Sequence, residues 1–394
     1  MQNNFFTEID CQQMNHHGEH ICGDVFLSGK AKEEGRIIAV LSDGMGHGVK
    51  ASVLATLTAT MALKFCKEHK APEKTSDIIM RTLPECSERR MSYSTFTIIS
   101  VKSNGETIIT EYDNPASILI RNRNLIELER KEITLQSEKN KGKKIYLSTF
   151  QAHKGDRLIF TSDGVTQSGL GTRMYPFGWG RENLIEFIKD LVTRYPRISA
   201  RQLATRITNV SYRNDGFNLK DDTSCGVIYF REPRDLLIVT GPPFNRNRDN
   251  EFANHVYNYK GKKIVMGGTT GDILSRELNL QIKDGQEFTD PELPPLSELE
   301  GFDLYTEGIL TLYKVEKILK KYTNNTRLGR GPADKVVKEL LESDRIELII
   351  GTRINLGHID PNSRIDLEIR RTVVKRIALM LEERFLKDVK MVFV

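Results

Sequence analysis

The sequence has no uncharged apolar run that approaches the ~20 residues needed to cross a bilayer. Its first residues, Met1-Gln-Asn-Asn, lack the basic start and apolar core of a signal peptide. Its five cysteines are scattered without any Cys-x-x-Cys pair, which argues against a disulfide framework. We therefore expect a cytoplasmic protein with reduced thiols and no membrane partner.

An excess of one charge is also missing. Lys and Arg number 58 against 53 Asp and Glu, so the net charge is only +5 over 394 residues. Basic and aromatic residues do not alternate, and nucleic-acid binding is not expected. The one basic cluster, residues 139–144, predicts a solvated hairpin tip. A length of 394 residues with 39% apolar composition allows two or three domains with their own cores.

The most informative stretch is residues 36–48, Arg-Ile-Ile-Ala-Val-Leu-Ser-Asp-Gly-Met-Gly-His-Gly. Its apolar run predicts a strand that is covered on both faces. Asp43 follows at the C-terminal end, and the glycines after it let the backbone take positive φ and approach a ligand closely. His47 is expected to shape this turn through bonds to local backbone.

Three further strand ends carry carboxylates. Residues 154–164 repeat the pattern of a strand followed by Ser-Asp-Gly and supply Asp163. Asp221 and Asp222 open another strand, and Asp24 opens a fourth. Any one of these steps is typical of a plain turn. Together they predict a site rich in carboxylate oxygen, which is the ligand type that Mg²⁺ and Mn²⁺ prefer.

A zinc site near the N-terminus is a competing interpretation. The residues that suggest it are Cys11, His16, His17, His20 and Cys22. His16 and His20 have a permitted spacing, but no close cysteine pair completes a tetrahedral set. A polar loop between two strands is the interpretation that we favour.

The pattern of residues 1–231 predicts an α+β layered sandwich. Helices are expected at 51–63, 73–83, 180–195 and 199–211, the first of them buried and too short to span a membrane. Residues 94–128 alternate between apolar and polar with turn signals between the runs, which is typical of a β-meander.

The four acidic motifs, at Asp24, Asp43, Asp163 and Asp221-Asp222, occur in an order that resembles the metal-dependent serine/threonine phosphatases of type 2C. The resemblance covers residues 1 to about 231 and is closest to the bacterial sporulation stage II E-type branch, with Asp-Gly-Met-Gly-His-Gly at 43–48 the most specific motif. It implies an α/β-β/α sandwich that holds two Mn²⁺ or Mg²⁺ ions. It also implies attack of metal-activated water on phosphoserine or phosphothreonine of a signalling protein, without a protein nucleophile.

The resemblance assigns roles residue by residue. Asp43 would bridge the two ions, and the Gly44 carbonyl would bind one of them. Asp24 would act largely through metal-bound water, and Asp163 with the Asp221-Asp222 pair would complete the site. Met45 stands where the eukaryotic branch has a histidine, so no general acid is assigned. No position matches the phosphate-binding arginine of the eukaryotic enzymes, and Arg36 and Arg157 are only strand-flanking candidates.

Residues 235–394 predict a small α/β domain with a mostly parallel sheet, because strands and helices alternate there. Strands are expected at 235–240, 263–266, 346–350 and 389–394, and helices at 249–258, 272–278, 310–321, 333–342 and 365–385. The loops after 240, 266 and 350 would then share one edge of the sheet, where such sheets bind ligands. We expect this domain to sense a small ligand or a protein and to regulate the phosphatase.

One loop of this domain is a candidate anion site. Its residues are Gly267, Gly268, Thr269, Thr270 and Gly271, whose backbone N–H groups lie at the start of a predicted helix. A tight strand-to-helix turn explains the same glycines.

Three functional classes remain open. The first is the phosphoprotein phosphatase, and the second is a two-metal hydrolase of a small phosphate or nucleotide. The third is a catalytically silent binding module, whose mark would be loss of a metal-binding aspartate. None is lost.

Overall fold

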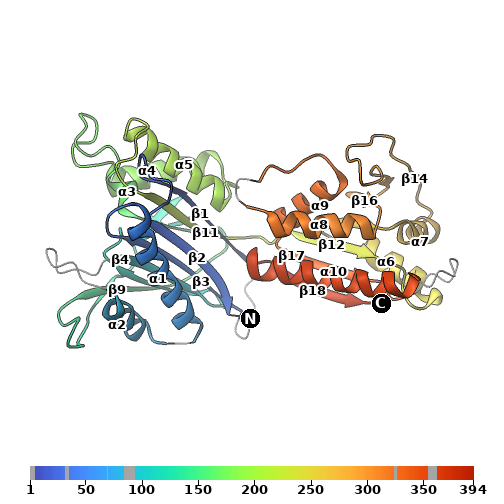
Figure 1. The fold of residues 1–394 in the computed structure, drawn as a ribbon, viewed down its shortest axis with the longest axis horizontal. Helices are drawn as coiled ribbons and strands as arrows, with labels where there is room; N and C mark the ends of the chain where they lie inside the picture. The colour runs from blue at the N-terminus through green and yellow to red at the C-terminus, as the bar shows by residue number, and fades with distance from the viewer. Residues whose placement is uncertain (1–4, 32–34, 69, 84–93, 324–325, 354–361) are drawn as a thin grey trace. The chain divides into compact units, whose positions relative to one another are not determined.

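The computed structural model describes residues 5–31, 35–68, 70–83, 94–323, 326–353 and 362–394. The chain divides into two compact units, Met1–Glu232 and Pro233–Val394 (Figure 1). Four cysteines are free thiols, and Cys86 lies outside the described residues.

The first unit contains two antiparallel sheets. The six-stranded sheet has the order β2 (Asp24–Ala31), β3 (Arg36–Gly44), β4 (Ser94–Val101), β5 (Glu106–Tyr112), β9 (Lys144–Gln151) and β8 (Lys131–Thr134). The five-stranded sheet has the order β1 (Phe6–Met14), β11 (Thr223–Arg231), β10 (Arg157–Thr161), β6 (Ile118–Arg121) and β7 (Asn124–Ile126).

Helices cover the outer face of each sheet. Two lie on the six-stranded sheet and three on the five-stranded sheet: α1 (Gly48–Lys67), α2 (Pro72–Thr82), α3 (Asp163–Thr166), α4 (Gly180–Arg194) and α5 (Ala200–Asn214) (Figure 1). The inner faces meet in one apolar core in which Leu41 of β3 and Phe160 of β10 are fully buried. Alternate residues of a strand point to opposite faces of its sheet, one toward the covering helices and one toward the other sheet. The result is four layers in the order helix, sheet, sheet, helix. The predicted α/β-β/α sandwich is confirmed.

The predicted meander at 94–128 is wrong in one respect, because its strands divide between the two sheets. β4 and β5 pair within the six-stranded sheet, whereas β6 and β7 pair within the five-stranded sheet. The chain crosses at Asp113, a non-glycine residue with φ of 61°. Alternation alone does not encode the crossing, since strands of either sheet bury one face.

Helix α1 is longer than the predicted 51–63. It runs for 20 residues, and among the described helices it alone is long and apolar enough to cross a membrane by length and composition. The length argument against a span therefore fails. In the structure, Ala59 and Ala62 of this helix pack against β3 and β4 in one apolar cluster.

The second unit is built on a fully parallel five-stranded sheet. Its order is β16 (Leu304–Thr306), β13 (Lys262–Met266), β12 (Asp235–Thr240), β17 (Arg345–Ile350) and β18 (Asp388–Phe393). One face carries α8 (Ile309–Lys321), α9 (Pro332–Glu342) and α10 (Asn362–Arg384), and the other carries α6 (Asp249–Tyr257) and α7 (Gly268–Leu278) (Figure 1). The predicted parallel sheet is confirmed, and its strand order reverses between β12 and β17.

Two local features of this unit differ from the prediction. Helix α7 begins at Gly268 rather than at 272, so the glycine-rich segment forms its first turn. A short hairpin of β14 (Ile282–Lys283) and β15 (Glu298–Leu299) brackets the loop at 291–295, and the three-residue helix η2 (Arg246–Arg248) precedes α6.

Candidate metal centre

Strand pairing places Asp24 directly opposite Asp43. β2 and β3 are antiparallel neighbours, and these two residues are partners in the register. Opposed residues of an antiparallel pair project to the same face with their Cβ atoms roughly 5 Å apart. The two carboxylates therefore point to the same side of the six-stranded sheet.

The five-stranded sheet brings the other carboxylates to the same place. The Ser162 backbone N–H donates to the Ser224 carbonyl at 3.1 Å, which ties the segment of Asp163 to the segment of Asp221 and Asp222. Gln13 links the sheets, because its Nε2 donates to the Asp24 carbonyl at 3.1 Å and to Ser224 Oγ at 3.0 Å. All the acidic residues predicted for the site therefore converge.

Glycines make this approach possible. A Cβ on Gly44 would lie 2.1 Å from the Ala51 carbonyl oxygen, and one on Gly164 would lie 2.2 Å from the Asp222 carbonyl oxygen. A Cβ on Gly23 would lie 2.6 Å from Asp222 Oδ2. Real Cβ atoms do not come so close to other atoms, so only glycine fits at these positions.

The cluster brings several carboxylates together, and burial and mutual repulsion raise the pKa values of most of them. Burial raises the pKa of Asp24 to about 7, and burial together with the Asp163 charge raises the pKa of Asp221 to about 6. Burial also raises the pKa of Asp43 well above its ordinary value, and the charges of Asp24 and Asp163 add to the effect. The pKa of Asp163 is raised by burial as well.

Several of these oxygen atoms are buried without a hydrogen-bond partner among the described residues. They are both carboxylate oxygens of Asp24, Oδ1 of Asp163 and Oδ2 of Asp222. An ionised carboxylate that is buried and unpaired is costly, so a cation is the natural partner of this cluster.

The donor set fits hard divalent ions, since every donor is a carboxylate or carbonyl oxygen. In the described part of the chain, no three His, Cys, Asp or Glu side chains already stand in the arrangement of a finished metal site. This applies to the zinc candidates near the N-terminus as well. A cation bound among these carboxylates would take the place of the protons that burial favours on Asp43 and Asp163.

Glu19, His47 and His16 form a neighbouring cluster that the sequence pattern did not predict. His47 Nδ1 lies 2.7 Å from Glu19 Oε1, and its ring stacks on the ring of His16 with centroids 4.5 Å apart. The backbone N–H of His16 donates to Asp222 Oδ1 at 3.0 Å. His47 therefore bonds a side chain from another loop and not the local backbone that was predicted. The one available signal is Gly48, where any Cβ would lie 2.8 Å from Glu19 Oε2.

Two hydrogen-bonded serines, Ser42 and Ser94, lie next to the Asp43 backbone. Ser94 Oγ donates to the Asp43 carbonyl at 2.9 Å and lies 2.6 Å from Ser42 Oγ. The repeated Ser-Asp-Gly sequence is the signal that could have identified Ser42 and its counterpart Ser162.

The two strand-flanking arginines lie away from the carboxylates. Arg157 opens β10, so it lies at the end of that strand opposite Asp163, and its guanidinium covers the Tyr229 ring at 3.8 Å. Arg36 opens β3 and bonds the Cys66 carbonyl. Neither residue is placed to contact a phosphate held by the carboxylate cluster.

The candidate anion loop lies in the second unit and is largely occupied by packing. Thr270 Oγ1 accepts the Gly241 backbone N–H at 2.9 Å. A Cβ on Gly271 would lie 2.2 Å from Tyr305 Oη, so this glycine allows α7 to pack against β16. Gly267, with φ of 114°, turns the chain from β13 into α7.

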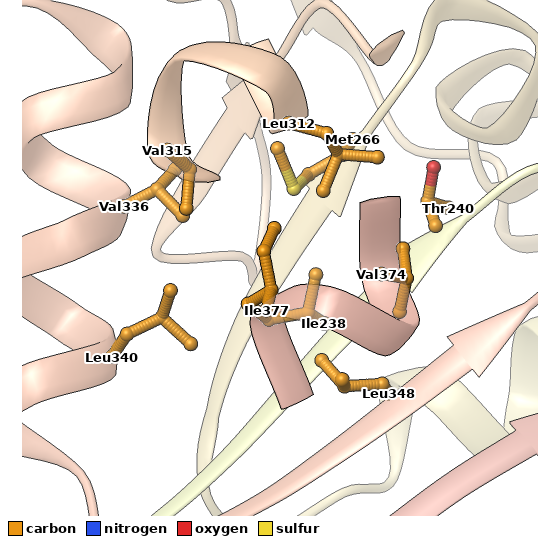
Figure 2. Close-up of a pocket in the computed structure, with 10 residues that line it drawn as sticks. All are labelled: Ile238, Thr240, Met266, Leu312, Val315, Val336, Leu340, Leu348, Val374 and Ile377. Carbon is orange, nitrogen blue, oxygen red and sulfur yellow. The ribbon is translucent and has the colours of Figure 1, made fainter. Parts of the chain in front are cut away.

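Figure 2 shows a cavity in the core of this unit. Ten side chains from the sheet and from α8, α9 and α10 line it, and Thr240 is the single polar one. Its volume of about 10 Å³ admits at most one water molecule. The cavity is a packing void and not a ligand site.

Comparison with known proteins places residues 33–231 in the family of stage II sporulation protein E (SpoIIE). No protein of curated function matches the sequence.

Solved structures give a weaker likeness, which concerns the fold. The PP2C phosphatase domain of SpoIIE from Bacillus subtilis, with a fragment of its regulatory domain, is 16% identical with a TM-score of 0.48, over 58% of this chain and 65% of that one. The RsbU and RsbW domains of a Mycobacterium tuberculosis protein are 17% identical with a TM-score of 0.45, over 64% and 67%. RsbX in complex with magnesium is 16% identical with a TM-score of 0.40, over 58% and 98%.

The present chain thus spans about two thirds of the length of that SpoIIE fragment. The family model covers half of the chain, including Asp43, Asp163, Asp221 and Asp222. The sandwich and the convergence of these carboxylates are independent of that match. The chain belongs to the family of stage II sporulation protein E (SpoIIE).

Proposed function

We propose that the protein hydrolyses phosphoserine and phosphothreonine residues of a signalling protein in the cytoplasm, with divalent cations as cofactor. The observation that supports this most strongly is the group of buried carboxylates with raised pKa values and unpaired oxygens where the two sheets meet. Such a group is costly in any protein that does not bind cations there.

Two Mn²⁺ or Mg²⁺ ions fit this donor set. Asp43 would bridge them, and the Gly44 carbonyl and Asp24 would complete one ion, the latter largely through water. Asp163, Asp221 and Asp222 would hold the other. When bound, the ions would supply an activated water for in-line attack on phosphorus and neutralise charge on the phosphoryl oxygens.

The chain's own residues prepare this site. Asp43 and Asp163, whose pKa values are raised by burial, must be deprotonated before both carboxylates can act as ligands. Ser94 fixes the carbonyl of Asp43, which orients the following turn. His16, in the loop after β1, stacks on His47 of that turn, and the His16 backbone N–H donates to Asp222 Oδ1, which links the turn to Asp222.

Phosphate release from a phosphoserine peptide tests the proposal. The purified chain should require Mn²⁺ or Mg²⁺ and lose activity in EDTA. Asp43→Asn should lower turnover by about a hundredfold or more, because the bridging anion is lost, while circular dichroism stays unchanged. Asp190→Asn, on the outer face of α4, is the matched control and should retain full activity. Full turnover of D43N would refute the site assignment.

Two alternatives have distinguishable outcomes. A two-metal hydrolase of a small phosphate or nucleotide would prefer a nucleotide panel over the phosphopeptide. A catalytically silent module would bind metal, seen as a rise in melting temperature, and release no phosphate from any substrate. The intact set of carboxylates favours catalysis over the silent module.

Regulation by residues 235–394, through a small ligand or a protein, is part of the same proposal. A chain of residues 1–232 should fold, because the first unit has its own apolar clusters, and its turnover or metal affinity should differ severalfold from that of the full chain. A fragment with identical kinetics would count against a regulatory second unit, whereas an insoluble fragment would mean that the boundary is misplaced or that the two units share a core.

A further inference from the structure

The loop of residues 169–178 exposes large apolar side chains beside the carboxylate cluster. Phe177 is 91% exposed and Met174 is 77% exposed, the two highest values for large apolar residues in the described part of the chain. Leu170 in the same loop is 45% exposed. Apolar groups gathered at a surface mark contacts with another molecule.

This loop is a built structure. Its base is closed by a hydrogen bond from the Trp179 backbone N–H to the Ser168 carbonyl at 2.8 Å. Within it, the Tyr175 N–H donates to Thr172 Oγ1 at 3.1 Å, and the Tyr175 side chain packs on the apolar cluster of α4 and α5. Compact surface loops with joined ends of this kind are frequently functional. The conformation of the loop therefore keeps Met174 and Phe177 exposed to solvent.

Hydrogen bonds join the loop to both carboxylate segments of the five-stranded sheet. Gln167, at its start, donates from Nε2 to Asp163 Oδ2 at 2.8 Å. Lys220, the residue before Asp221, donates from Nζ to the Leu170 carbonyl at 2.7 Å. Asp215 accepts the Gly169 N–H at 2.7 Å and the Lys220 N–H at 3.2 Å. The exposed apolar groups are thus fixed relative to the cluster.

A second exposed aromatic residue belongs to the same network. Phe217 lies between Asp215 and Lys220, is 58% exposed and has φ of 66°. A bulky residue in this region of backbone space is strained, and such strain is concentrated at functional sites. Its ring packs edge-on against Tyr212 with centroids 5.2 Å apart.

We propose that the 169–178 loop docks the apolar residues that flank the phosphorylated residue of the protein substrate. This inference rests on the proposed phosphatase function, because the loop extends the surface around that site. A small phosphate ester or nucleotide has no apolar chain to place against Met174 and Phe177, whereas a polypeptide has. Methionine and aromatic residues are the types enriched at the centres of protein interfaces.

Steady-state kinetics of the full chain test this inference with three substrates. Two are phosphoserine peptides, one with Leu and Phe beside the phosphoserine and one with Asn and Gly there, and the third is p-nitrophenyl phosphate. The double variant M174S/F177S should lose about tenfold or more in kcat/KM on the apolar-flanked peptide, mainly through KM. The polar-flanked peptide and p-nitrophenyl phosphate should show no such loss. Phe244→Ser, at a phenylalanine of the second unit that is 74% exposed, should leave all three rates unchanged.

Other results would overturn the inference. They are equal losses on both peptides, no loss on either, or conversion of a dimer into a monomer by the double variant in light scattering, which would make the patch a self-association surface. If the wild-type chain hydrolyses none of the three, the phosphatase function fails. Fluorescence anisotropy of the labelled apolar-flanked phosphopeptide then decides separately about docking: weaker binding by M174S/F177S supports it, and equal binding refutes it.

Discussion

The two units treat the ends of their strands in opposite ways. In the first unit, burial raises the pKa values of Asp24 and Asp163, and both oxygens of Asp24 and Oδ1 of Asp163 have no hydrogen-bond partner among the described residues. In the second unit, two polar side chains at the C-terminal edge of the parallel sheet have partners within that unit. Thr270 accepts the Gly241 N–H, and buried Asp249 pairs with Arg276 and Arg353. A glycine-rich turn alone is therefore a weak sign of a site, and unbalanced buried charge is a stronger one.

Matched substitutions of aspartate should give opposite results in the two units. Asp24→Asn should raise the melting temperature in EDTA, because an unpaired buried carboxylate is removed, and should lower metal affinity by about ten- to a hundredfold. Asp249→Asn should lower stability by about 2 to 3 kcal/mol with or without metal, because Arg353 and Arg276 lose the buried carboxylate between them. Calorimetric melts with Mn²⁺ and with EDTA measure both. The contrast fails if D24N destabilises the metal-free protein.

A pair of glycines tests whether the turn before α7 serves packing or ligand binding. Gly271→Ala should cost about 1 to 3 kcal/mol, since its Cβ would lie 2.2 Å from Tyr305 Oη. Gly268→Ala meets no atom within 4 Å and should stabilise the helix by up to about 1 kcal/mol. Thermal melts with and without inorganic phosphate report both effects. A phosphate-dependent rise in melting temperature that G268A abolishes would instead establish an anion site there.

Metal binding by the first unit should depend on pH. The pKa values of Asp24 and Asp221 are raised to about 7 and about 6, so protonation of these groups stabilises the metal-free fold. That contribution is complete below the unfolded-state pKa near 4 and is lost as the pH rises through 6 to 7. Metal must displace these protons, so Mn²⁺ affinity should rise by about tenfold per pH unit for each proton released and level off above about pH 7. Isothermal titration of EDTA-stripped protein between pH 5.5 and 8 checks this, and a flat profile would contradict it.

The layered sandwich and the carboxylate set could be predicted from sequence because each depends on short-range patterns. The apolar run before Asp43 and the similar run before Asp163 each predict a strand and place an aspartate at its C-terminal end. Strand and helix alternation after residue 235 likewise predicted the parallel sheet. The periodicity of apolar residues shows which face of each helix or strand is buried, and this is sufficient to predict how the elements form layers.

Features that join distant segments could not be predicted in this way. The pairing of Glu19 with His47 depends on a loop that folds over another turn, and nothing in either segment names the other. The division of 94–128 between two sheets depends on the backbone at Asp113. The exposure of Phe177 is equally invisible, because a phenylalanine in a glycine-rich loop is as compatible with burial as with solvent.

The register of β2 against β3 has a consequence for folding. Asp24 faces Asp43 only while this pairing holds, and a slip by one residue would turn one carboxylate to the opposite face of the sheet. Bound cations would therefore select the native register among the alternatives that a hairpin can sample. The amide protons of residues 24–31 and 36–44 should then exchange more slowly in the presence of Mn²⁺ than in EDTA, and the metal would act as a clamp on strand alignment as well as a cofactor.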